Sequence, residues 1–195
     1  MKLVIATKNK HKLKEISQML EGQIEVVGLD KYPQIPETIE DGKTFEENAL
    51  KKAREVFAAT KTWTLADDSG LEVEALKGEP GIYSARYAGA GASYEAICQK
   101  LLKNMDGVPE EKRDAQFNCT MALISPDGEE QVVVGLCKGH ISQAMKGEHG
   151  FGYDPVFVYD NTDKTLAEIS SEEKNKISHR ANALKKIKEI LKKRA

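Results

Sequence analysis

The sequence is poor in cysteine, nearly neutral and free of long apolar runs. Its three cysteines are scattered and include no Cys-x-x-Cys pair, which excludes a zinc ribbon and argues against a disulfide framework. With a net charge of −2, the chain lacks the overall positive charge that is typical of proteins that bind DNA or RNA. No apolar run approaches the roughly 20 residues that span a bilayer. We therefore expect a cytoplasmic protein whose partners include neither a membrane nor a nucleic acid.

The four histidines lack the spacing of metal ligands, and the sequence contains no internal repeat and no low-complexity segment. Its 195 residues are enough to bury a core, and 40% hydrophobic and 31% charged residues are typical of a globular protein. We expect a single domain spanning residues 1–195. The apolar stretch at residues 3–6 is too short for a signal peptide and predicts a first strand.

Strand and helix patterns alternate along the chain. Apolar runs of strand length lie at residues 3–6, 25–28, 63–66, 117–124, 131–137 and 156–159. Helical spacing of apolar residues follows capping residues at Asn9, Thr44, Ser93 and Ser170 and begins again near Ser178. The two runs around the Ser-Pro-Asp-Gly segment at residues 125–128 predict a hairpin. The pattern favours an α/β fold with a mixed, partly antiparallel sheet rather than a purely parallel one.

Two adjacent carboxylates, Asp67 and Asp68, follow the apolar run at residues 63–66. We expect the strand to end there and the next two residues, Ser-Gly, to form a turn, beyond which residues 71–73 are a candidate continuation. Paired acids at a strand end suit Mg²⁺ and orient a water, and phosphoanhydride hydrolysis needs both. The same composition is also typical of an ordinary turn. Glu40 and Glu72 are further candidate oxygen ligands, but Mg²⁺ usually takes only one or two protein carboxylates, so the ligand set stays open.

The polar turn Thr7–Lys12 lies between the first predicted strand and the first predicted helix. A helix N-terminus offers free N–H groups and a positive dipole end, which attract phosphate. Lysines at this end oppose the dipole, and such local conflicts tend to mark functional sites. The turn is not a Walker A loop, because the required glycines and the Gly-Lys-Ser/Thr ending are absent. The alternative interpretation is a basic first turn with solvated lysines.

The segment Gly150–Pro155 alternates glycine with two aromatic residues. Glycine lets a backbone approach a flat ligand, and an aromatic ring can stack on a nucleobase. The alternative is that both rings fill the core. Further donors for a purine carbonyl or a phosphate follow at Lys174, His179 and Arg180, which also fit a charged helix surface. The basic tail at residues 185–194 is interpreted as the solvated face of the last helix.

Together these segments are similar to the inosine triphosphate pyrophosphatase family, also known as the Ham1-like or non-canonical purine NTP pyrophosphatases. The matching segments are, in chain order, residues 7–12, 44–49, 66–71, 78–87, 150–155 and 178–180. The resemblance implies a homodimeric α/β protein with an elongated mixed sheet, flanking helices and two lobes around a nucleotide cleft. It also implies Mg²⁺-dependent hydrolysis of ITP, dITP and XTP to the monophosphate and pyrophosphate, which cleanses the nucleotide pool.

The resemblance also assigns roles to residues. Asp68 matches the family's catalytic acid/base and metal position. Glu40 lies where the family has a metal-linked Glu, although this chain reads Glu-Asp-Gly at residues 40–42 and the family usually reads Glu-Thr-Gly. The matching substrate-binding positions are Thr7, Lys8, Asn9, Lys10, His11, Lys12, Ser69, Phe151, Gly152, Tyr153, Asp154, Lys174, His179 and Arg180.

Two other functions are alternatives. A Maf-like nucleotide pyrophosphatase cuts the same bond in modified or pyrimidine nucleotides, but that family resembles Leu-Ala-Ser-x-Ser-x-x-Arg near its start, whereas residues 5–9 here read Ile-Ala-Thr-Lys-Asn. A module that binds Mg-nucleotide without turnover would need the same acids and lysines. An RNA-binding protein that uses the basic tail is disfavoured by the net charge and by the lack of an aromatic-basic stripe.

Overall fold

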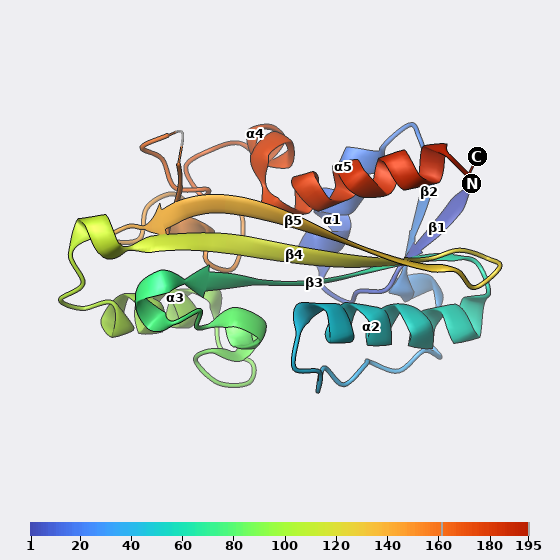
Figure 1. Ribbon diagram of the computed structural model, residues 1–195, viewed down its shortest axis with the longest axis horizontal. Coiled ribbons are helices and arrows are strands. Elements are labelled where there is room, and N and C mark those ends of the chain that lie inside the picture. Colours follow the sequence, from blue (N-terminus) through green and yellow to red (C-terminus); the bar gives the residue numbers. More distant parts are fainter. Residues whose placement is uncertain (161, 195) are drawn as a thin grey trace. The chain divides into compact units, whose positions relative to one another are not determined.

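The structure is a computed structural model that describes residues 1–160 and 162–194 (Figure 1). Its main elements are β1 (Lys2–Ile5), α1 (Lys10–Leu20), β2 (Glu25–Gly28), α2 (Phe45–Thr60), β3 (Trp63–Val73), α3 (Tyr94–Asn104), β4 (Asp114–Ile124), β5 (Glu130–Ile141), β6 (Phe157–Tyr159), α4 (Ser171–Ile177) and α5 (His179–Lys192). In this described part of the chain, no helix has both the length and the apolar character needed to cross a membrane.

The strands form one mixed sheet in the order β2-β1-β3-β4-β5-β6. Strand β1 pairs in parallel with both β2 and β3, whereas β5 and β6 are antiparallel. The predicted α/β class and the mixed sheet are therefore confirmed. The predicted hairpin is also present, since β4 and β5 are joined by residues 125–129.

The chain divides into two compact units. The first unit contains Met1–Asp68, Cys119–Gly135 and the chain from Arg180 onward, and the second contains Ser69–Asn118 and Leu136–His179. Strands β3, β4 and β5 each supply residues to both units. The division of β3 falls between Asp68 and Ser69, so Asp67 and Asp68 both belong to the first unit.

In the first unit, helices cover both faces of the sheet (Figure 1). Successive residues of a strand point to opposite faces. Leu3 and Ile5 accordingly pack with the apolar residues of α1 and α5, whereas Val4 packs with Ala49 and Ala53 of α2. This alternation of apolar residues explains why β1 reads as a continuous hydrophobic run: it is buried on both faces.

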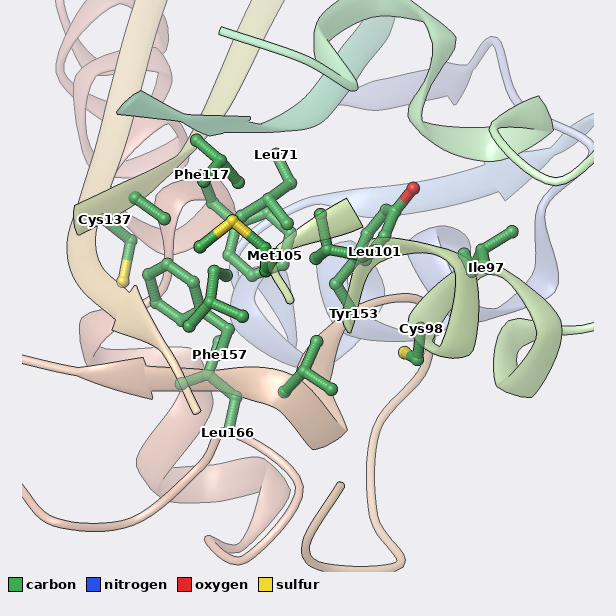
Figure 2. Close-up of a cluster of buried hydrophobic side chains, with 14 of the residues drawn as sticks. Leu71, Ile97, Cys98, Leu101, Met105, Phe117, Cys137, Tyr153, Phe157 and Leu166 are labelled. Carbon is green, nitrogen blue, oxygen red and sulfur yellow. The ribbon is translucent and has the colours of Figure 1, made fainter. Parts of the chain in front are cut away.

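The second unit has its own core, built around β3, β4, β5 and α3 (Figure 2). The rings of Phe117 and Phe157 lie 4.7 Å apart at their centroids, in a tilted arrangement. Leu101 of α3 and Tyr153 are buried in the same cluster. Because cores pack at near-crystalline density, these side chains fix the positions of the loops that follow them.

The expected end of the third strand at Asp67 is wrong, because β3 continues without a break to Val73. The Asp-Asp-Ser-Gly composition favours a turn, but β3 lies between β1 and β4 in the sheet, and pairing on both sides overrides that local preference. The consequence is geometric. Since side chains alternate along a strand, Asp67 and Asp68 point to opposite faces of the sheet.

The predicted caps are confirmed at four helices. The side chains of Asn9, Thr44, Ser93 and Ser170 each accept hydrogen bonds from backbone N–H groups of the first helical turn. The full capping box predicted at Thr44 is only half formed, because the Glu47 carboxylate accepts from the Lys43 N–H instead of that of Thr44. The local sequence thus predicts where these helices begin, including α1, which begins within the turn Thr7–Lys12, called the lysine turn below.

Candidate active site

Asp68 points toward α2, where two donors hold its carboxylate. Lys52 Nζ donates to Asp68 Oδ1 at 3.0 Å, and Asn48 Nδ2 donates to Asp68 Oδ2 at 3.1 Å. Asn48 and Lys52 are four residues apart on α2, so they lie on one face of the helix. One helix therefore fixes both oxygens of this carboxylate.

Glu40 shares the same ammonium group. Lys52 Nζ lies 2.6 Å from Glu40 Oε1 and 3.0 Å from Asp68 Oδ1, so oxygens of both acids are within reach of one cation. Two protein carboxylates match the number that Mg²⁺ usually takes, with waters and substrate phosphates as its other ligands. In the described part of the chain, no group of three or more His, Cys, Asp or Glu side chains is arranged to hold a metal. Asp68 and Glu40 provide oxygen donors of the kind that a divalent cation binds.

Asp67 lies in a different environment, on the face covered by α1 and α5. Its Oδ2 accepts from Lys12 Nζ at 3.0 Å and from Arg180 Nη2 at 3.0 Å. Arg180 Nη1 in turn donates to Glu15 Oε2 at 2.5 Å. Both Asp67 and Arg180 are only 1% exposed. Arg180 thus links two acids inside the first unit, a role that the sequence did not predict, while its nucleotide contact stays a prediction.

These surroundings move the pKa values of the two adjacent acids in opposite directions. Burial alone would raise the pKa of Asp67, but the positive charges of Lys12, Arg180 and Lys52 outweigh it and hold that pKa well below its usual range. Burial raises the pKa of Asp68, and Lys52 and Lys12 offset only part of the effect. Two acids whose pKa values are moved apart in this way suit different tasks. Asp67 stays negatively charged, and Asp68 is the better proton acceptor.

The buried Arg180 pairs predict a large effect on stability. Arg180→Met leaves Glu15 and Asp67 short of a cation, and breaking a buried pair in this way costs about 3–5 kcal/mol of unfolding free energy. Urea denaturation measures this loss. The control is Arg54→Met, because Arg54 forms its 2.7 Å pair with Glu130 at 58% exposure, where a loss under about 1 kcal/mol is expected. Equal losses in the two variants would contradict the prediction.

Some side chains of the lysine turn have partners within the protein, and others face the solvent. The Asn9 side chain accepts from the N–H groups of His11 and Lys12, at 2.9 and 3.3 Å, and Thr7 Oγ1 accepts from the Asn9 N–H at 3.2 Å. The side chain of Lys12 is directed to Asp67. Lys8, Lys10 and His11 are exposed. One lysine is therefore held in place by a buried acid, and the others remain at the surface of the first unit.

In the second unit, Asp154 organises the glycine-rich segment. Its Oδ2 accepts from Lys174 Nζ at 2.5 Å and from the Phe151 N–H at 2.8 Å. Lys174 Nζ also lies 4.6 Å from the centroid of the Phe151 ring, a cation–π arrangement. A Cβ on Gly150 would lie 2.0 Å from Asp154 Oδ2, so this close approach requires glycine. The structure brings these predicted residues together within one unit.

Other predicted substrate-binding residues of the second unit also have structural contacts. Tyr153 is buried among apolar side chains (Figure 2). Its hydroxyl donates to the Ser84 carbonyl at 2.9 Å. The His179 ring stacks on Phe117, with centroids 4.6 Å apart. The Gly152 carbonyl accepts from Cys98 Sγ at 3.3 Å. Ser69 is half-buried in β3. Their contacts with a nucleotide stay predictions.

The sequence model of the Ham1 family matches residues 3–190 of this chain. The chain belongs to the Ham1 family. It is 48% identical over 192 residues to the dITP/XTP pyrophosphatase of Desulforamulus reducens, covering 98% of this chain and 96% of that protein. It is 46% identical over 189 residues to the dITP/XTP pyrophosphatase of Bacillus subtilis, with 96% of each chain covered.

Solved structures of the Ham1 family share the fold. The Ham1 protein of Staphylococcus aureus superposes with a TM-score of 0.89 at 41% identity, covering all of both chains. The dITP/XTP pyrophosphatase of Mycobacterium abscessus gives a TM-score of 0.77 at 44% identity, covering 96% of this chain and 98% of that one. The resemblance inferred from short motifs is therefore confirmed over nearly the whole chain.

Sequence reasoning about this Ham1 chain missed Asn48, Lys52 and Glu15 as site residues. A signal for the first two was present. They lie four residues apart in a helix whose neighbouring positions, Ala49 and Ala53, are buried. Polar residues beside an apolar stripe are costly to bury unless they have partners. Glu15 had no such signal, because its partner Arg180 lies far away in the sequence.

Proposed function

We propose that this chain hydrolyses the α–β phosphoanhydride of non-canonical purine nucleoside triphosphates, ITP, dITP and XTP, to the monophosphate and pyrophosphate. The observation that carries the proposal is the convergence of Asp68 and Glu40 on one cationic position. The names of the relatives, dITP/XTP pyrophosphatase, support the substrate class. The proposal includes a single catalytic domain over residues 1–195, which the chain length supports, and a cytoplasmic location, which the scattered cysteines support. It also includes a homodimer, as the family resemblance implies.

The proposed cofactor is Mg²⁺, held by Asp68 and Glu40. When bound, it supplies Lewis-acid stabilisation of the charge on phosphate oxygens. The carboxylates of these two residues suit such an ion because it prefers oxygen ligands. Lys52 keeps its proton. Burial alone would lower the pKa of its ammonium group, but the negative charges of Asp68 and Glu40 outweigh burial, and the net shift is upward. Its ammonium group therefore stays positively charged at the point where the two acids meet.

In the proposed reaction, Asp68 accepts a proton from the water that attacks the α-phosphorus. A new P–O bond forms on the α-phosphorus, its bond to the bridging oxygen breaks, and pyrophosphate leaves. Lys8, Lys10 and Lys12 neutralise charge on the phosphates, and the N–H groups at the start of α1 add donors. Asp67 supports this step by holding the Lys12 side chain at 3.0 Å. Ser69, Phe151–Asp154, Lys174, His179 and Arg180 are proposed to contact the nucleotide.

Pyrophosphate release tests the proposed function directly. With ITP and Mg²⁺ we expect release of one pyrophosphate for each inosine monophosphate formed, because the attacked phosphorus is the α-phosphorus. Chelation of the divalent cation with EDTA should abolish the release, and added Mg²⁺ should restore it. ITP binding without any pyrophosphate would instead indicate a nucleotide-binding module. Faster turnover of modified or pyrimidine nucleotides than of ITP would indicate the Maf-like activity.

A further inference from the structure

Asn48 is a buried amide in a helix whose other buried residues, apart from Lys52, are apolar. It lies in α2 and is only 1% exposed, beside the buried Ala49 and Ala53. Asparagine is a poor helix former, and burial of its amide is costly unless both ends have partners. Both ends of Asn48 do have partners: one is Asp68, and the other is Gly42, two residues from Glu40.

The orientation of the Asn48 amide is fixed by a backbone donor. The Gly42 N–H donates to Asn48 Oδ1 at 2.9 Å, so that atom must be the carbonyl oxygen. Nδ2 is then the end that faces Asp68 Oδ2, at 3.1 Å. A Cβ on Gly42 would lie 2.6 Å from Asn48 Oδ1, so the backbone can approach this closely only at glycine.

The two hydrogen bonds connect the segment that carries Glu40 to the carboxylate of Asp68. Gly42 is two residues from Glu40, and the Lys52 ammonium contacts both acids. The Lys52 contact is one flexible side chain, whereas Asn48 joins a backbone N–H to the second oxygen of Asp68. Rotation of the Asp68 carboxylate is therefore restricted at both of its oxygens.

We propose that Asn48 is a positioning residue, which holds the Asp68 carboxylate and the Glu40 segment in the relative geometry that a divalent cation requires. This inference rests on the proposed function for its catalytic consequence, and on the hydrogen bonds of Asn48 for its structural part. Partners that orient metal ligands affect metal affinity or activity by about 10–100-fold when they are removed. In this assignment Asn48 acts through Asp68, and it contacts neither the reacting water nor the phosphorus.

The test uses the full chain with Asn48→Leu, which keeps the approximate side-chain shape but removes both hydrogen bonds. Mn²⁺ affinity is measured without nucleotide, by electron paramagnetic resonance of free Mn²⁺, and is expected to fall at least about 10-fold. With saturating Mg²⁺, kcat for ITP is expected to fall at least about 10-fold per folded molecule, while KM changes less than about 3-fold. The same replacement at the exposed Asn104, which donates to the Tyr87 hydroxyl, is the control and should change neither.

Gly42→Ala is the second variant, because it displaces the Asn48 amide without removing it. It should reproduce the loss of Mn²⁺ affinity, which keeps the proposal testable if Asn48→Leu folds poorly. A lower unfolding temperature with unchanged Mn²⁺ affinity and kcat in both variants overturns the proposal, since a merely structural residue behaves in that way. If the parent chain binds Mn²⁺ but releases no pyrophosphate from ITP, the proposed function fails, and the Mn²⁺ comparison still decides the role of Asn48.

Discussion

Asp68→Asn should lower kcat for ITP hydrolysis by about 10²- to 10⁴-fold, the usual contribution of a positioned general base. Asparagine matches aspartate in shape but cannot accept a proton from water. The asparagine amide also matches the neighbouring hydrogen-bond donors poorly. Asn48 Nδ2 and Lys52 Nζ each donate to one oxygen of Asp68, so an amide at residue 68 would place its own N–H₂ against one of these donors.

The measurement is initial-rate pyrophosphate release at saturating ITP and Mg²⁺, with binding of a non-hydrolysable ITP analogue followed separately. We expect nucleotide binding to survive, because the lysine turn is unchanged. Asp30→Asn is the matched control: it makes the same chemical change at an exposed carboxylate, which forms a surface ion pair with Lys31 at 3.6 Å. Near-normal turnover in Asp68→Asn would remove Asp68 from the mechanism.

The contrast between Asp67 and Asp68 shows what the sequence can and cannot predict here. The motif was visible as a paired acid after an apolar run, and the caps at Asn9 and Ser170 followed from local chemistry alone. The different roles of the two acids were not visible. They depend on strand alternation through residues that read as a turn, and on Arg180, which comes from the far end of the chain.

In the second unit, the roles of Phe151 and Tyr153 were likewise not predictable from the local sequence. The alternation of glycine with Phe151 and Tyr153 gave two interpretations, ligand contact or core filling, that local sequence could not separate. The structure separates their surroundings: Tyr153 is buried among apolar side chains (Figure 2), whereas the Phe151 ring lies against Lys174 and remains half-buried. Burial depends on long-range packing, so it is the property that a short motif reveals least.

The other large effect expected is discrimination between bases. Hypoxanthine and xanthine carry an oxygen at position 6, whereas adenine carries an amino group. A site that offers donors to that oxygen would place donor against donor with adenine, and an unpaired buried polar group can reduce kcat/KM by about 10⁴-fold. Guanine shares the 6-oxygen, so it must be rejected at position 2. We expect kcat/KM for ITP and XTP to exceed that for ATP by up to about this factor, with GTP also disfavoured.

Initial rates of pyrophosphate release across ITP, XTP, ATP and GTP measure this selectivity, and equal kcat/KM for ATP and ITP would contradict it. Both Nη atoms of Arg180 already donate to buried acids, so His179 and backbone N–H groups are the better proposed donors to the base. His179→Phe preserves an aromatic ring to stack on Phe117 but removes the ring donors. It should therefore lower kcat/KM for ITP without lowering the value for ATP, because the donor that opposes adenine's amino group is removed together with the donor to the 6-oxygen. His140→Phe in β5 makes the same replacement outside the predicted site, so a similar loss there would assign the effect to packing.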